Sequence, residues 1–118
     1  MQKLLLEGQR AEMLRNGATN AQRPEEPIDF KPVVKLFVPW GAATWLLTEL
    51  ETDDGEDIAF GLCDLGMGFP ELGRVSLTEI RQLRGPGGLY VERDIHFRAD
   101  KTLSQYAADA RAKERIDA

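Results

Sequence analysis

The middle of the chain alternates between short apolar runs and turn residues. Residues 33–38 are rich in β-branched and aromatic side chains, and residues 44–51 and 58–65 are similar runs. Asp54 and Gly55 separate the second run from the third, and an Asp-Gly pair tolerates the positive φ angles of a tight hairpin turn. The three runs therefore predict consecutive antiparallel strands joined as a β-meander.

The second half of the chain carries helix signals and one further strand pattern. Ser76 to Glu79 and Thr102 to Gln105 each have the form of a helix-capping box. Between them, residues 90–97 alternate apolar and polar side chains, as a half-buried strand does. The sequence thus predicts a short helix, a fourth strand and a C-terminal helix.

The first 32 residues divide into a helical stripe and a proline-containing stretch. Residues 1–17 carry apolar positions at helical spacing and end on a glycine, which is a common helix stop. Residues 18–32 contain three prolines, and proline fixes φ and removes a backbone donor. We therefore expect an N-terminal helical arm (1–17), a linker (18–32) and a single α+β domain (33–118) with a four-stranded, mainly antiparallel sheet and helices packed on one face.

Composition excludes several classes of protein. Hydrophobic residues make up 42% of the chain and charged residues 30%, which is ordinary for a folded soluble domain. Cys63 is the only cysteine, so an internal disulfide is impossible, and with a single histidine the chain lacks the ligands of a four-coordinate Cys/His zinc site. No apolar run is long enough to span a membrane or to act as a signal peptide, so we expect a cytoplasmic location without a membrane partner.

Charge is unevenly distributed along the chain. Fifteen Lys and Arg against twenty Asp and Glu give a net charge of −5, which opposes indiscriminate binding to nucleic acid. Acidic residues cluster in residues 49–57, whereas residues 74–98 contain five arginines. Arginines that share a face would form an anion site, and an exposed Trp40 would add a stacking surface for bases. The glycine-rich loop at residues 66–73 would either act in recognition or anchor Phe69 in the core. The candidate binding residues are Trp40, Phe69, Arg74, Arg84 and Arg93.

A second candidate site lies on the predicted fourth strand. Glu92, Asp94 and His96 occur at period two, so their side chains leave the same face of a strand. Two carboxylates and an imidazole suit Mg²⁺ or Mn²⁺, which would activate water against a phosphodiester. Asp64 and Glu71, which flank the glycine-rich loop, would complete the oxygen ligands. The alternative is a solvated sheet face without a cofactor, because the other side of this strand is apolar.

The stretch at residues 58–73 is similar to the signature of the domain of unknown function family 2958. Further matching segments extend the resemblance to about residues 32–107; they are 34–37, 44–50, 75–77, 83–85 and 92–97. Arg74 departs from the family, where an aromatic residue is common at this position. The resemblance implies a small bacterial protein, often encoded on plasmids and integrative elements beside DNA-transfer genes. Some members of the family carry the label of a single-stranded DNA endonuclease.

Together these observations predict a non-enzymatic accessory or regulatory binding protein in plasmid or integrative-element DNA transfer. We expect a protein partner, contacted through the N-terminal helix, with a homodimer as one alternative and nucleic acid as a weaker one. The alternative function is a metal-dependent single-stranded DNA endonuclease with Glu92, Asp94 and His96 as catalytic residues.

Overall fold

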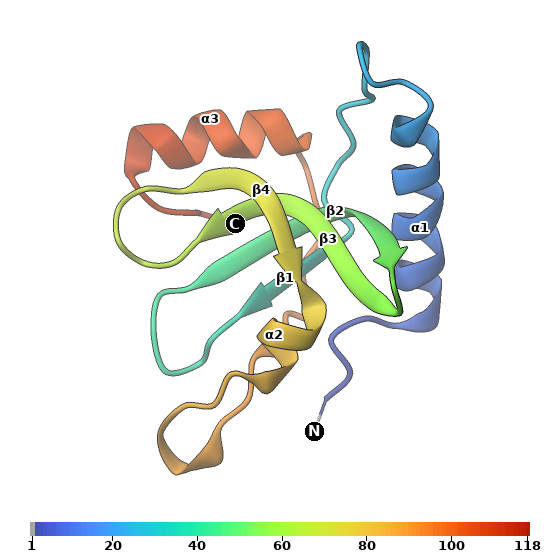
Figure 1. Cartoon of the computed structure of the whole chain (residues 1–118). Helices are drawn as coiled ribbons and strands as arrows, with labels where there is room; N and C mark the ends of the chain where they lie inside the picture. Colours follow the sequence, from blue (N-terminus) through green and yellow to red (C-terminus); the bar gives the residue numbers. More distant parts are fainter. Residues whose placement is uncertain (1) are drawn as a thin grey trace.

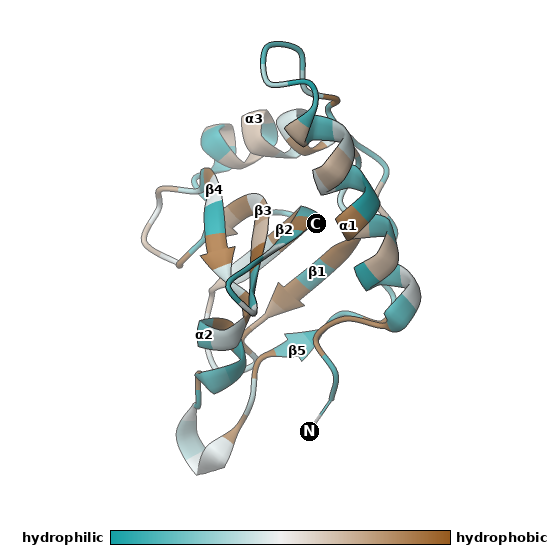
Figure 2. Cartoon of the chain, turned by 45° about the vertical axis from the view of Figure 1, so that its right-hand side comes forward, coloured by the Kyte–Doolittle hydropathy of each residue, from teal (hydrophilic) through white to brown (hydrophobic). Residues whose placement is uncertain are grey.

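The strands of the chain pair into one antiparallel sheet. The computed structural model describes residues 2–118. Its elements are α1 (Glu7–Ala21), β1 (Val34–Phe37), β2 (Thr44–Asp53), β3 (Glu56–Asp64), β4 (Glu71–Ser76), α2 (Leu77–Gln82), a 3-10 turn (Pro86–Gly88), β5 (Glu92–Arg93) and α3 (Leu103–Lys113). The strand order is β4-β3-β2-β1-β5, and every pairing is antiparallel. Figure 1 labels β1 to β4, and Figure 2 labels β5. The predicted α+β class is confirmed, with five strands in the sheet rather than four.

The predicted meander is confirmed as β1, β2 and β3. Asp54 and Gly55 form the turn between β2 and β3 with φ angles of 51° and 80°, positive values that aspartate tolerates and glycine adopts without strain. The two predicted capping boxes also begin helices. The Ser76 hydroxyl accepts a hydrogen bond from the Glu79 backbone N–H at the start of α2, and the Gln105 side chain accepts one from Thr102 at the start of α3.

One strand of the sheet was not predicted from the sequence. β4 pairs with β3 along its whole length but lies at the edge of the sheet. Leu72 and Arg74 are therefore exposed, and Gly73 has no side chain to bury. An edge strand of this composition lacks the apolar alternation that marks a half-buried strand.

The fourth strand predicted over residues 90–97 is wrong except at Glu92 and Arg93, which form β5. β5 has two residues, and the chain then turns away from the sheet. Asp94 causes this turn, because its Oδ1 accepts a hydrogen bond of 2.9 Å from the His96 backbone N–H, and its carbonyl accepts one of 3.3 Å from Phe97. An aspartate that binds the backbone two residues ahead favours a turn over a strand.

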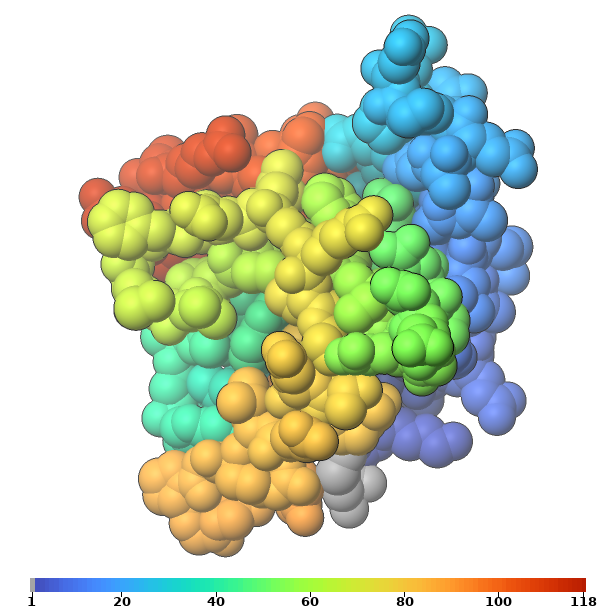
Figure 3. Space-filling view, viewed as in Figure 1, coloured from blue at the N-terminus to red at the C-terminus, as the bar shows by residue number. Residues whose placement is uncertain are grey.

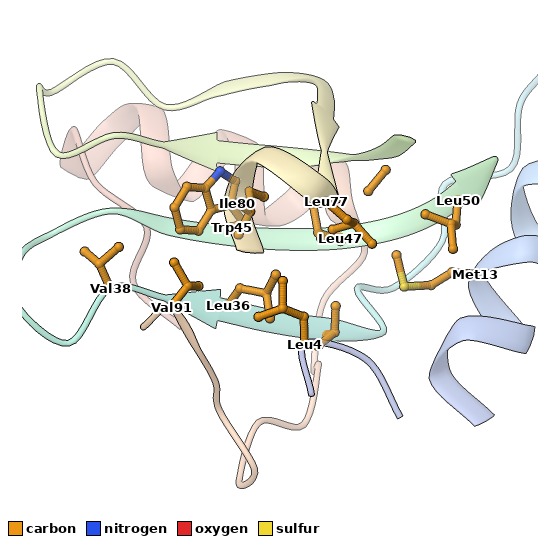
Figure 4. Close-up of a cluster of buried hydrophobic side chains, with 12 residues drawn as sticks. Leu4, Met13, Leu36, Val38, Trp45, Leu47, Leu50, Leu77, Ile80 and Val91 are labelled. Carbon is orange, nitrogen blue, oxygen red and sulfur yellow. The ribbon is translucent and has the colours of Figure 1, made fainter. Parts of the chain in front are cut away.

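Helices cover both faces of the sheet, whereas the prediction placed them on one. Trp45 and Leu47 of β2 belong to the core cluster that includes residues of α1 and α2 (Figure 4). Leu46 of β2 points to the opposite face, where it packs with Leu103 and Tyr106 of α3. Consecutive apolar residues in a strand are buried on two faces, so β2 requires cover on both sides. Figure 2 shows apolar residues concentrated in the strands, with the α1–β1 linker largely hydrophilic.

The N-terminal helix packs against the sheet. It begins at Glu7 and ends at Ala21, whereas the prediction placed the helix over residues 1–17. Leu4 and Met13 are buried in the same core as β1 and β2. The helix continues through Gly17 because this glycine allows close approach to β2: a Cβ there would lie 2.5 Å from the Leu50 carbonyl oxygen. No helix within residues 2–118 has both the length and the apolar character needed to cross a bilayer.

An ion pair ties α1 to the β2–β3 hairpin. Arg10 donates two hydrogen bonds to the Asp57 carboxylate, of 2.5 and 3.0 Å. This hydrogen-bonded guanidinium lowers the pKa of Asp57. The pair joins segments 47 residues apart in the sequence, so it stabilises tertiary structure rather than one element.

We expect Arg10→Ala to lower the free energy of unfolding by about 1 kcal/mol at neutral pH, in the range of partly exposed ion pairs. Because the folded-state pKa of Asp57 is lowered, the contribution is complete above the unfolded-state pKa and is lost as the pH falls through the folded-state pKa. Denaturant titrations at neutral and strongly acidic pH measure this difference. Arg15→Ala, at an exposed position of the same helix, is the control. An Arg10→Ala deficit of equal size at both pH values would contradict the assignment.

Candidate functional site

The candidate metal ligands on the predicted fourth strand are not brought together. Glu92 is an exposed residue of β5, while Asp94 and His96 lie in the turn that follows. The Asp94 Oδ2 lies 3.5 Å from Lys35 Nζ, and its Oδ1 is used in the turn. Within residues 2–118, no three Asp, Glu, His or Cys side chains form a group that could hold a metal ion. Binding of Mg²⁺ or Mn²⁺ stays a prediction. Because β5 ends at Arg93, the side chains of Glu92, Asp94 and His96 do not leave one face of a strand.

Asp64 and Glu71 point to opposite faces of the sheet. Glu71 is paired across the strands with Cys63, the neighbour of Asp64, and neighbouring strand residues alternate between faces. Asp64 is 2% exposed and uses both carboxylate oxygens: Oδ1 accepts from the Gly66 N–H at 2.8 Å and Oδ2 from the Ile116 N–H at 2.9 Å. Asp64 therefore ties the end of β3 to the C-terminal segment.

The candidate arginines are held separately. Arg74 of β4 forms a 2.8 Å ion pair with Glu51 of β2. Arg84 lies over the ring of Tyr90, 4.0 Å from its centroid. Arg93 of β5 donates to a backbone carbonyl of the N-terminal segment. Since β4 and β5 are opposite edges of the sheet, Arg74 and Arg93 do not share an anion site.

Trp40 is half-buried between two loops. It follows β1 and packs against the core, and Gly85 lies directly against its indole. A Cβ at Gly85 would be 2.2 Å from the Trp40 ring, so the glycine is needed for this contact. Because Gly85 lies against the indole ring, Trp40 joins the β1–β2 loop to the segment after α2.

Large apolar side chains are exposed in the loop between β3 and β4. Leu65 is 59% exposed, Met67 70% and Phe69 79%. We call residues 65–69 the apolar loop. It projects from one side of the molecule in the space-filling view, where it is yellow-green (Figure 3). The sequence singled out Phe69 for recognition or for anchoring in the core, and the structure places it outside the core.

Contacts at both ends fix the apolar loop. The Asp64 carboxylate holds Gly66 at the beginning, and Pro70 is buried at the end. Gly66 also touches Ala42 of the β1–β2 loop: a Cβ at Gly66 would lie 3.0 Å from that methyl group. Gly66 and Gly68 have φ angles of 81° and 85°, which side chains other than glycine rarely adopt. The loop is therefore supported by the scaffold while its apolar side chains remain exposed.

Sequence reasoning missed Leu65 and Met67. A signal was present, because both alternate with Gly66 and Gly68 in the segment that joins β3 to β4. Glycines that need positive φ interrupt an extended strand, so the apolar residues between them cannot continue the buried pattern of β3. The positions of Gly66 and Gly68 were visible in the sequence, but their positive φ angles were not.

Residues 4–117 match the family described as Protein of unknown function (DUF2958). This match spans nearly the whole chain and includes α1 and α3, beyond the segment at residues 32–107 that carried the sequence resemblance. No curated protein and no solved structure matches the chain.

Proposed function

We propose that this chain, which belongs to the DUF2958 family, is a non-enzymatic binding protein that docks a partner protein through the apolar loop. The observation that carries the proposal is the exposure of Leu65, Met67 and Phe69, each at least 59% exposed. Contiguous apolar side chains on a surface loop mark interaction sites, because their exposure to water is unfavourable in the absence of a partner. A loop held by a rigid scaffold presents them in one arrangement.

Reactive groups are scattered, which supports binding over catalysis. Glu92 is exposed on β5, the Asp94 carboxylate bonds to its own turn and lies beside Lys35, and Asp64 is occupied by backbone N–H groups. Burial raises the pKa of the Cys63 thiol to about 11, so the thiol is protonated and a poor nucleophile at neutral pH. None of these residues supplies an arrangement that activates water or a substrate.

Charges around the apolar loop indicate the chemistry of the partner. Glu71 is exposed directly after the loop, and a Cβ at Gly68 would lie 3.7 Å from the Glu114 Oε2. The whole chain carries a net charge of −5. These charges favour a partner with an apolar pocket rimmed by Lys and Arg, and they repel the phosphates of nucleic acid.

The setting of this proposal is DNA transfer by plasmids or integrative elements, in the cytoplasm. The family resemblance supports this setting, and a single unpaired cysteine fits a reducing compartment. Proteins that handle DNA carry basic surfaces, so a basic partner agrees with such a role.

The proposed contact is the apolar loop rather than the N-terminal helix. Three polar residues of α1 bind other parts of the same chain: Arg10 binds Asp57, Asn16 donates to the Thr48 carbonyl, and Asn20 donates to Glu49. Met13, its buried apolar residue, lies inside the core. The helix therefore contributes its main contacts to the fold.

We expect Phe69→Ser to weaken partner binding by about 30-fold, the effect of losing about 2 kcal/mol from an aromatic anchor. Its melting temperature should stay near the wild-type value, because Phe69 makes little contact with the core. Affinity capture from the native host identifies the partner, and calorimetry with the purified pair gives the affinities.

Ile95→Ser is the matched control for this experiment. Ile95 is 65% exposed and follows β5, at the opposite edge of the sheet from β4. The Ile95→Ser variant should bind the partner with wild-type affinity. Equal affinities of Phe69→Ser and wild type would overturn the proposal, and so would equal losses in the two variants. Sedimentation measures self-association of the two chains. If the wild-type chain self-associates and Phe69→Ser does not, the loop binds a second copy of this chain, and the proposal of a different partner protein is overturned.

A further inference from the structure

A hollow of about 610 Å³ lies against the sheet, beside the beginning of α3. Its floor is formed by β2, β3 and β4. Its walls are the C-terminal end of α1, the linker between α1 and β1 (residues 22–33) and the first residues of α3. Figure 1 shows these three walls converging at one end of the sheet. The residues come from six different parts of the chain, so no local sequence motif indicates the hollow.

Most of the hollow is apolar but open to solvent. Ile58 and Phe60 of β3 lie on the floor and are half-buried. Ile28 of the linker and Leu72 of β4 border it, and they are 41% and 40% exposed. Aromatic and aliphatic side chains of this kind provide the contact surface of small-molecule sites.

The linker wall is fixed by hydrogen bonds. The Asn20 side chain donates to the Ile28 carbonyl at 3.0 Å and accepts from the Ile28 N–H at 2.7 Å. The Asp29 carboxylate accepts from both the backbone N–H and the hydroxyl of Ser104, at 3.0 and 2.5 Å. These bonds join the linker to α1 and α3, so the hollow is formed in advance of any ligand.

Glu49 supplies the polar group with unused bonding capacity. It lies on the floor and is half-buried, and its Oε2 accepts a hydrogen bond of 3.1 Å from Asn20. Its Oε1 has no hydrogen-bond partner among residues 2–118. Burial raises the pKa of this carboxyl, so the hydrogen bond from Asn20 only partly offsets the cost of removing the charged carboxylate from water. A positively charged donor at Oε1 would offset this cost.

The charges of the lining select against anions. Three carboxylates line the hollow, those of Asp29, Glu49 and Glu51, and Arg74 is the one cationic side chain in the lining. Arg74 is already paired with Glu51 at 2.8 Å. The charge of Arg74 also acts on Glu49, but three carboxylates against one guanidinium leave the lining with a net negative charge, which would repel an anionic ligand.

We propose that this hollow binds a small organic cation with an apolar body. Its ammonium or guanidinium group hydrogen-bonds to Glu49 Oε1, and its body packs against Ile58 and Phe60. The volume of the hollow lies within the range of about 300–1,000 Å³ that is typical of small-molecule sites. The inference does not depend on the proposed docking role, because the apolar loop at residues 65–69 is outside the lining.

Three probes that share one phenylbutyl carbon skeleton but differ in charge test this inference: phenylbutylamine, phenylbutanol and phenylbutyrate. Each is titrated into the full chain while backbone amide chemical shifts are recorded. The amine should bind with a dissociation constant of about 1 mM, as expected for a fragment of this size, and the alcohol about tenfold more weakly. The butyrate should bind least. The shifts should centre on Asn20, Glu49 and Phe60.

Glu49→Gln tests the role of the carboxylate with little change in shape. In this variant, the amine should bind about tenfold more weakly than in the wild type, with the affinity of the alcohol. Glu79→Gln removes the same charge from an exposed position of α2, outside the lining, and should keep the wild-type preference for the amine. Equal binding of amine and alcohol to the wild-type chain would overturn the inference, and so would shifts outside the hollow or no binding by any probe. These wild-type outcomes do not depend on how the variants fold.

Discussion

Asp64→Ala is expected to lower the free energy of unfolding by about 3 kcal/mol, because a buried carboxylate bonded to two backbone N–H groups contributes about 1.5–3 kcal/mol through each bond. The Gly66 and Ile116 N–H groups lose their acceptor in this variant. Both ends of the contact are affected: the apolar loop loses its anchor at β3, and the C-terminal segment loses its link to the sheet. Denaturant unfolding measures the loss.

The loosened loop should also bind the partner more weakly. Hydrogen exchange of residues 65–69 is expected to rise, since the Gly66 N–H is no longer bonded. Asp94→Ala is the matched control, because Asp94 also accepts from the backbone two residues ahead but is half-buried rather than buried. Its cost should be below about 1 kcal/mol. Equal costs in the two variants would contradict the structural role of Asp64.

Gly61→Ala is expected to destabilise the chain by about 3 kcal/mol or more, at the upper end of overpacking effects. A Cβ at this position would lie 2.0 Å from the Leu46 carbonyl oxygen and 2.8 Å from the Leu47 Cα. Both atoms belong to the backbone of β2, so no side-chain rotation relieves the overlap. The two central strands would have to separate, which disturbs the cores on both faces of the sheet.

Gly73→Ala is the control for this prediction. Gly73 is the partner of Gly61 in β4, and a Cβ there meets nothing within 4 Å. Alanine at this open position should change the stability by less than about 0.5 kcal/mol, or raise it slightly by restricting the unfolded chain. Thermal unfolding compares the two variants. A Gly61→Ala melting temperature equal to that of Gly73→Ala would contradict the close packing of β2 on β3.

Sequence reasoning succeeded where the signal is local. The Asp54-Gly55 turn and the Thr102–Gln105 capping box specify their conformations through neighbouring residues, and both are confirmed. Sequence reasoning failed where a residue has a tertiary role, or where a local turn interrupts an alternating apolar pattern. Gly17 resembled a helix stop but serves close packing on β2, and the Asp94 turn ended a strand that alternation alone extended to residue 97.

The candidate sites were less predictable than the fold. Phe69 was chosen because it lies in a glycine-rich loop, but its exposure depends on positive φ angles at Gly66 and Gly68. The hollow beside α3 unites Asn20, Glu49 and Phe60, which are distant in the sequence. Sequence spacing cannot place such residues together before the strand order and the two covered faces of the sheet are known.

The most direct test of the docking role places the photoreactive residue benzoylphenylalanine at position 69 in the native host. The account predicts that irradiation joins the chain to one basic protein, and that Leu65→Ser together with Met67→Ser abolishes the adduct. The same residue at position 95, on another exposed surface, should give no such adduct. Equal adducts at the two positions, or none at position 69, would contradict the assignment of the apolar loop as the docking surface.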